Sequence, residues 1–184
     1  MDNTNIRCFR ILDEQNKITM KLSQLFLEEL KNEAANTRRI LAAVPLDKGD
    51  FKPHEKSFSL KRLAVHVAEI NGWWNETLLQ DELDFSKGDY KPVEINTTED
   101  LLALHDRLVA NAEKILSEVS EEEFAKSWSM RNGEQVYFTM PKGAVARTWC
   151  LNHLYHHRAQ LTVYLRLLNV PVPGMYGPTA DVQG

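Results

Sequence analysis

The chain has 184 residues, of which 43% are hydrophobic and 26% charged, and its net charge is −4. This composition is ordinary for a globular protein, and the length suits one domain, so we expect a single domain over residues 1–184. No segment concentrates Lys and Arg. The sequence therefore argues against a nucleic acid or a membrane surface as a partner, because both require a basic footprint.

Apolar stretches are short throughout the chain, because charged residues interrupt them every few positions. None approaches the ~20 residues of a membrane-spanning helix, and residues 1–12 lack the apolar run of a signal peptide. We therefore expect a cytoplasmic protein. Two cysteines, Cys8 and Cys150, form no Cys-x-x-Cys pair. Both are predicted to be free thiols, with Cys150 a small buried hydrophobe inside a helix.

Four segments have the apolar spacing of an amphipathic helix. They are residues 20–44, 60–79, 98–119 and 142–168. Ser57 or Ser59 is expected to cap the second segment, and Thr97 or Thr98 the third. Four long helices without a repeat predict an all-α four-helix bundle. The links after the second and third helices are long, so the order of the helices in space stays open.

A different pattern occupies residues 127–139, where hydrophobic and polar residues alternate on both sides of Asn132-Gly133. An Asn-Gly pair flanked by alternation is the strongest short-range signal of a hairpin. We expect a short β-hairpin immediately before the last helix. Residues 81–96, which are polar, are predicted to form a loop, and residues 175–184 an extended tail.

Three histidines are candidate metal ligands. His153 and His157 are four residues apart, so on a helix they stand on one face and can bind one ion. His66 lies in the second predicted helix, at the rim of its apolar stripe. A bundle can bring the three rings together on a cation, with nitrogens ~2.0–2.2 Å from it. The alternative for His66 is a core histidine bonded to a backbone carbonyl.

The remaining histidines fit this site less well. His156 points about 100° away from His157 around the helix, and is interpreted as a surface group or an outer partner of the site. His105, in the third helix, and His54, in a loop, are expected to be solvated. Arg158 is expected to hold a loop through a salt bridge.

Other residues near the predicted site could take part in chemistry. Glu69, three residues after His66, could be a fourth ligand, a general base or a rim carboxylate facing water. Gln160 and Tyr164 continue the stripe of His153 and His157 and could reach the same cavity. The adjacent tryptophans at 73 and 74 are expected to be pocket wall or core.

The motifs around these histidines resemble those of the DinB-like (damage-inducible) superfamily of metal-binding four-helix bundles. The second helix contains Leu-Ala-Val-His-Val-Ala-Glu followed by Trp-Trp, and the last contains His-x-x-x-His-Arg-x-Gln and ends at Val-Pro-Val-Pro. The resemblance covers nearly the whole chain, although Ala159 stands where family members commonly have glycine. It implies that His66, His153 and His157 bind a divalent ion such as nickel or zinc. It also implies a homodimer, as in many members, and a low-molecular-weight thiol, as in the branches that are thiol-dependent transferases or isomerases.

Three protein ligands leave coordination positions open, whereas a structural zinc site usually has four. An open site of this kind lowers the pKa of bound water to ~7 or deprotonates a bound thiol. The first hypothesis is therefore a metal-dependent transferase or hydrolase of a small molecule, which would sit against Trp73 or Trp74. The alternatives are a non-catalytic metal or small-ligand binding protein and a metal-stabilised scaffold. No nucleotide-binding glycine loop or serine hydrolase elbow is present.

Overall fold

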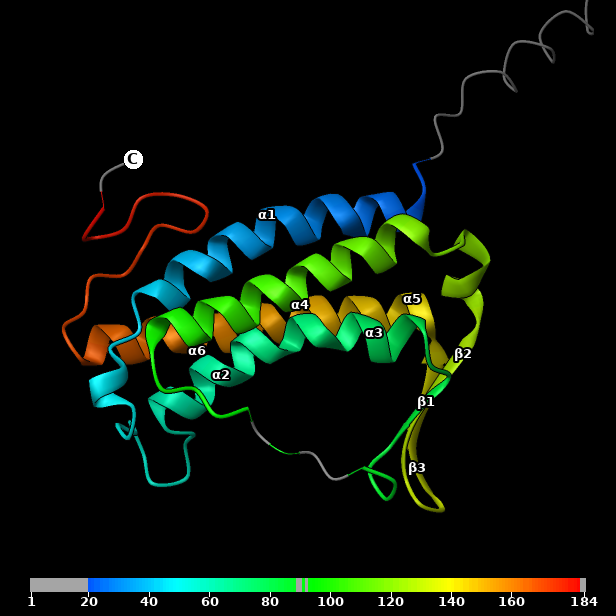
Figure 1. The fold of residues 1–184 in the computed structure, drawn as a ribbon, viewed down its shortest axis with the longest axis horizontal. Coiled ribbons are helices and arrows are strands. Elements are labelled where there is room, and N and C mark those ends of the chain that lie inside the picture. The colour runs from blue at the N-terminus through cyan, green and yellow to red at the C-terminus, as the bar shows by residue number, and fades with distance from the viewer. Residues whose placement is uncertain (1–19, 89–90, 92, 183–184) are drawn as a thin grey trace, which may run out of the picture.

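A computed structural model describes residues 20–88, 91 and 93–182 of the chain (Figure 1). The fold is mostly helical and carries a small sheet at one end. The predictions for Cys8 and for the rest of residues 1–12 concern positions outside these ranges. Among the helices that the structure describes, none is long and apolar enough to cross a membrane.

Two long helices run side by side along the molecule in Figure 1, α1 (Leu22–Ala42) and α4 (Thr98–Glu118). The helix α2 (Leu60–Glu69) packs against α4 and against α6 (His153–Leu167). A buried hydrophobic core fills the space between these helices. The predicted helical architecture is confirmed at this level.

Local sequence explains where two of the helices begin. The Thr97 hydroxyl accepts a hydrogen bond from the Asp100 backbone N–H, and the Asp100 carboxylate accepts one from the Thr97 backbone N–H. This reciprocal capping box satisfies donors that the first helical turn leaves unpaired. Ser59 caps α2 with a single bond, by accepting from the Arg62 N–H, so of the two predicted serines Ser59 is the cap.

The second and fourth predicted helices are not continuous. A 3₁₀ turn at Ile70–Gly72 separates α2 from α3 (Trp73–Leu78). A Cβ atom at Gly72 would lie only 3.3 Å from Leu108 Cδ2 of α4, so glycine lets the turn approach α4 closely. In the last helix, the π-helical segment Ala146–Asn152 lies between α5 (Lys142–Val145) and α6.

The sheet contains the predicted hairpin and one additional strand. Strands β2 (Ser127–Asn132) and β3 (Gln135–Pro141) pair antiparallel, and Gly133 in their turn adopts a φ of 59°, which favours glycine. Strand β1 (Glu82–Asp84) pairs parallel with β2, so the prediction of a loop for residues 81–96 is wrong at these positions. A three-residue strand is too short to show alternation, and its partner is distant in sequence.

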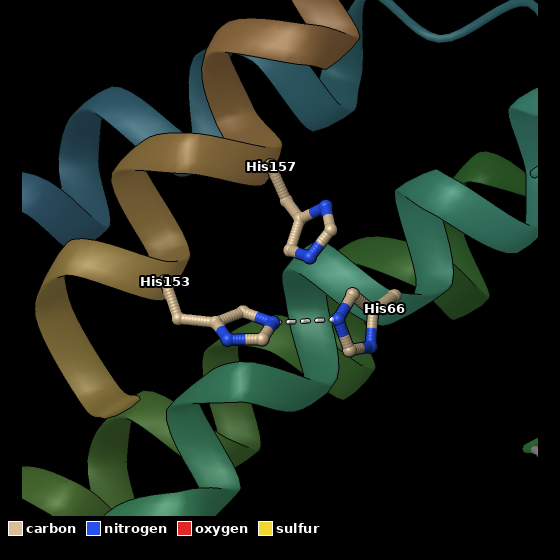
Figure 2. Close-up of side chains that lie close together, drawn as sticks. All are labelled: His66, His153 and His157. Atoms are coloured by element: carbon tan, nitrogen blue, oxygen red, sulfur yellow. Dashed lines mark hydrogen bonds between the residues drawn. The ribbon is translucent and has the colours of Figure 1, made fainter. Parts of the chain in front are cut away.

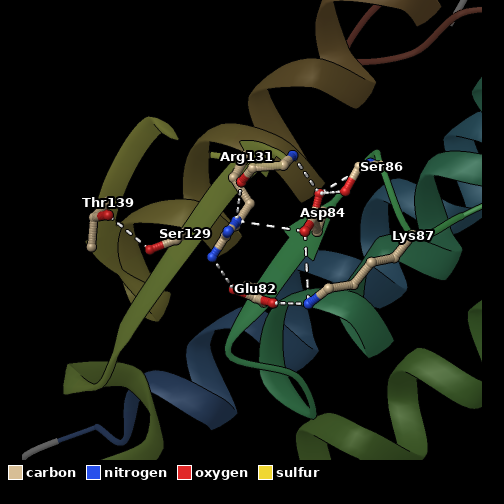
Figure 3. Close-up of polar contacts among 8 residues, drawn as sticks. Glu82, Asp84, Ser86, Lys87, Ser129, Arg131 and Thr139 are labelled. Atoms are coloured by element: carbon tan, nitrogen blue, oxygen red, sulfur yellow. Dashed lines mark hydrogen bonds and ion pairs between the residues drawn. The ribbon is translucent and has the colours of Figure 1, made fainter. Parts of the chain in front are cut away.

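Polar side chains join β1 to the hairpin (Figure 3). The Asp84 carboxylate accepts hydrogen bonds from the Gly133 N–H at 2.9 Å and from the Ser86 hydroxyl at 2.7 Å. Lys87 pairs with Glu82 at 2.7 Å. Arg131 pairs with both carboxylates, at 3.4 Å from Glu82 and 3.5 Å from Asp84. We call Glu82, Asp84, Ser86, Lys87 and Arg131 the sheet cluster; every charge that it contains is paired.

The last described residues, 170–182, lack helix or strand and are tied back to the helices. Arg158 is 3% exposed and donates to the Glu33 carboxylate at 2.5 Å and to the Tyr176 hydroxyl. The Tyr176 hydroxyl in turn donates to Glu33 at 2.7 Å. The salt bridge predicted for Arg158 is present, but it joins α6 to Glu33 of α1, and the loop is held through the Tyr176 hydroxyl instead. Asp181 adds a second tie, to Arg166 at 2.6 Å.

One predicted surface residue lies in the interior. His105 is 1% exposed, and its Nδ1 lies 3.0 Å from an Asp106 carboxylate oxygen, so the expectation of a solvated histidine is wrong. The position follows Leu101 by four residues and belongs to the apolar stripe of α4, which could have been read from the spacing. Cys150 is buried and free, as expected.

Candidate metal centre and adjoining cleft

Three histidines from two helices converge inside the bundle (Figure 2). His66 projects from α2, and His153 and His157 project from successive turns of α6. One nitrogen of each ring lies within 4.8 Å of those of the other two. The Nε2 atoms of His66 and His153 are 3.1 Å apart. The residues that sequence spacing singled out therefore lie together, at half-buried positions.

The arrangement fits a bound divalent ion. Nitrogens that share an ion at ~2.0–2.1 Å stand about 2.8–3.4 Å from each other at octahedral to tetrahedral angles, which includes the 3.1 Å spacing of His66 and His153. Imidazole is a donor suited to zinc and nickel. Among the described residues, the cluster of adjacent ligand atoms contains these three histidines and not Glu69.

The three imidazoles are suited to donate lone pairs at neutral pH. Burial and, to a lesser extent, the charges that neighbouring histidines would carry lower the pKa of His66 and of His153 to about 4. Burial also lowers the pKa of His157, against the opposing effect of a hydrogen bond to Gln160. Protons therefore leave these nitrogens at neutral pH, which is the state that binds metals.

A hydrogen bond fixes the orientation of His157. The Gln160 amide oxygen lies 2.8 Å from His157 Nδ1, and an amide oxygen only accepts, so Nδ1 carries the proton and Nε2 keeps its lone pair. The Gln160 amide nitrogen lies 3.0 Å from His156 Nε2, which orients the amide. Gln160 is thus the outer acceptor for His157, and exposed His156 contacts the site through Gln160, as an outer partner of the kind interpreted from the sequence.

Aromatic rings enclose the histidines. The ring centroids of His153 lie 4.8 Å from Trp73 and 5.4 Å from Trp149, and the latter pair is stacked. Phe58 covers the other side, 6.0 Å from His66 and 6.3 Å from His157. Sequence analysis missed Trp149, although it precedes His153 by four residues and so shares its helical face.

A cleft of about 800 Å³ opens beside the histidines, and His66, Glu69 and Trp73 line it. Trp74, the other predicted wall residue, is instead 1% exposed and packs in the core against Phe26. Of the two tryptophans expected to be pocket wall or core, Trp73 is therefore the wall residue and Trp74 the core residue.

A second, smaller pocket of about 360 Å³ lies on the other side of the site, lined by His157, Tyr164 and Phe58 among others. The Tyr164 hydroxyl donates to the Phe58 carbonyl at 2.9 Å. Its proton is therefore engaged with the backbone, and Tyr164 shapes this pocket.

Packed helices with three converging, neutral histidines define a helical-bundle protein with an open histidine site. The DinB family model matches residues 14–182, and the chain belongs to the DinB family.

The fold of this chain is similar to that of a DinB-like protein from Bacillus subtilis, with a TM-score of 0.61, 16% identity, and coverage of 80% of this chain and 96% of the other. A DinB-like protein from Bacillus cereus gives a TM-score of 0.62 at 22% identity, over 82% and 95% of the two chains. Identities this low establish the fold alone. A search of curated proteins finds no match.

Proposed function

We propose that this DinB-family protein binds one divalent ion through His66, His153 and His157 and acts on a small molecule held in the adjoining cleft. The observation that carries the proposal is the convergence of three imidazole nitrogens within 4.8 Å of one another. Such a donor set, without a fourth protein ligand in the cluster, corresponds to a catalytic rather than a structural site.

The bound ion would supply a nucleophile at neutral pH, by lowering the pKa of a coordinated water or thiol. The chain's own residues supply the surroundings. Trp73 provides an apolar wall beside His153 and excludes water from that side. Glu69 lines the same cleft as His66 and is assigned as the carboxylate that accepts the proton of an entering thiol or water.

The reaction class that we propose is a metal- and thiol-dependent transfer to an electrophilic small molecule, with hydrolysis as the variant in which water replaces the thiol. Nickel and zinc are the proposed ions, because both accept imidazole nitrogen. Family resemblance supports the thiol, and the open site beside a cleft supports a reaction of either type. We further propose that the protein is a homodimer and that it resides in the cytoplasm. Light scattering tests the homodimer, since the measured mass should correspond to two chains per particle.

The alternative function is a non-catalytic metal or small-ligand binding protein. The same three histidines and the same cleft would serve it equally well, and a metal-stabilised scaffold needs only the histidines. These functions differ in what metal removal changes: an enzyme loses turnover, a binding protein loses ligand affinity, and a scaffold loses only thermal stability.

The test begins with protein purified without an affinity tag, whose metal content is measured by elemental analysis. We expect close to one equivalent of nickel or zinc. Metal-free and reloaded protein are then incubated with a small thiol such as cysteine and a model electrophile such as monobromobimane. Thioether formation that requires the loaded protein supports the transferase. Stoichiometric metal without turnover of thiol or water substrates favours the binding protein, and the absence of bound metal contradicts the proposal.

A further inference from the structure

Two tryptophans present part of their indole surface to the cleft. Trp73 and Trp149 are both half-buried and both line the cavity beside His66. Their ring centroids lie 4.8 Å apart with an angle of 43° between the planes. We call this pair the tryptophan platform. Because Trp73 and Trp149 both also contact His153, the platform is continuous with the histidine cluster.

An unusual backbone geometry presents Trp149 in this position. The segment Ala146–Asn152 is π-helical and therefore turns less per residue than an α-helix. In an α-helix, residues four apart are offset by about 40° around the axis. The wider turn reduces this offset, and the Trp149 ring stacks over His153 with an angle of 27° between the planes. π-Helical turns inside α-helices occur frequently at functional sites, which is consistent with a role for Trp149.

The rest of the cleft is also largely apolar. Aliphatic side chains from β1, α4 and the segment before α4 line it: Leu83, Val93, Leu104 and Leu108. Its volume of about 800 Å³ falls within the ~300–1,000 Å³ typical of sites for small organic ligands. Indole surface in contact with water is unfavourable, so a ligand that covers it gains free energy from the water released.

We propose that the tryptophan platform binds a planar aromatic ring of a small molecule whose opposite end reaches the histidine cluster. The platform selects flat rings because stacked and edge-to-face contacts with indole require them. The role of this molecule as a reactant rests on the function proposed above. Its binding to the platform does not, because the platform and the cleft are formed by side chains alone.

The experiment measures binding to metal-free protein by calorimetry with two probes of similar size, 2-naphthol and its saturated analogue decahydro-2-naphthol. We expect the flat probe to bind more tightly by about two- to tenfold, the range of an aromatic pair. Trp149→Leu should reduce the affinity for 2-naphthol by a similar factor. The control Tyr137→Leu, which alters a half-exposed aromatic residue of β3 outside the cleft lining, should leave it unchanged.

A second variant, Trp73→Leu, leaves the π-helical segment intact and covers the case in which Trp149→Leu unfolds the protein. Equal affinity for the two probes, or unchanged affinity for 2-naphthol in both folded tryptophan variants, would overturn the proposal. Failure of the proposed metal centre gives a different result. Wild-type protein would then contain no metal as purified, while the metal-free protein would still bind the flat probe more tightly.

Discussion

The sheet cluster and the histidine cluster are both polar groups beside an apolar interior, but they differ in how their partners are supplied. In the sheet cluster each charge meets an opposite charge from the same chain, as with Lys87 and Glu82 at 2.7 Å. In the histidine cluster, the Nε2 atoms of His66 and His153 lie 3.1 Å apart. Each of these nitrogens would donate its lone pair to a bound metal ion. The first cluster is complete in itself, whereas the second would be completed, under the proposed function, by a metal ion.

This difference separates structural polar groups from functional ones. Hydrogen bonds from the Gly133 N–H and the Ser86 hydroxyl lower the pKa of Asp84 to about 2 and keep it charged, which fastens β1 to the hairpin. Burial, with no carboxylate partner among the causes, lowers the pKa of His66 to about 4 and keeps it neutral, which leaves a lone pair to donate. Substitutions in the two regions should accordingly affect different measurements.

The largest expected effect is the loss of metal from His157→Ala. Removal of one of three ligands should weaken metal binding by more than about 100-fold, because loss of an outer partner alone costs about 10–100-fold. His156→Ala is the matched control and should cost much less metal, since His156 is not one of the three clustered histidines and acts on His157 only through Gln160. Elemental analysis of both purified variants measures the outcome, and equal losses would contradict the assignment.

Gln160→Ala should come next, with metal affinity reduced by about 10–100-fold, because His157 loses the acceptor that fixes its tautomer. Gln160→Glu retains an acceptor oxygen at this position and should keep most of the affinity. Competition with a chromophoric chelator gives both dissociation constants. An alanine variant that binds as tightly as wild type would exclude Gln160 as the orienting group.

At the sheet end of the molecule, Lys142→Met should reduce the free energy of unfolding by about 2 kcal/mol without changing metal content. The Lys142 side chain is 1% exposed, and its Nζ lies 2.6 Å from a Glu123 oxygen and 3.3 Å from the Leu78 carbonyl. Lys126→Met removes another partner of Glu123, one whose side chain is 61% exposed, and should cost about 0–1 kcal/mol. Urea denaturation followed by circular dichroism distinguishes the two, and similar losses would contradict the importance of burial.

The smallest effect is expected from Asp84→Asn, and it should depend on pH. Hydrogen bonds from the Gly133 N–H and the Ser86 hydroxyl lower the pKa of Asp84 from 3.8 to about 2. A carboxyl group with a lowered folded-state pKa stabilises the fold above pH ~4 and loses this contribution as the pH falls to ~2. The variant should therefore be less stable than wild type at pH 7. Between pH 4 and pH 2 its free energy of unfolding should decrease less than that of wild type. Parallel pH profiles of stability for the two proteins would exclude this role.

Sequence periodicity was sufficient for α1 and α4 and for the shared helical face of His153 and His157, because these depend on residues three or four apart. The apolar spacing of 98–119 closely matches α4, and the spacing of His153 and His157 places them on one face. The hairpin followed from its Asn-Gly turn, since turn chemistry is also local.

The features that sequence analysis missed depend on contacts between distant segments. The apolar stripe of the second helix continues through Ile70–Gly72, so the 3₁₀ turn becomes visible only with α4 packed against Gly72. Strand β1 forms because it pairs with β2, and the sheet cluster forms because this pairing brings its residues together. The π-helical segment and the stacking of Trp149 on His153 likewise reflect packing in the assembled bundle rather than residue type.

The separation of the three histidines along the chain has a consequence for biosynthesis. His66 and His153 lie 87 residues apart, and α4 and the sheet are made between them. A ribosome that has translated α2 has produced one of the three histidines, and the other two emerge only with α6. Under the proposed function, an ion held by all three could not template early folding of the nascent chain, and its acquisition would follow closure of α6 onto α2.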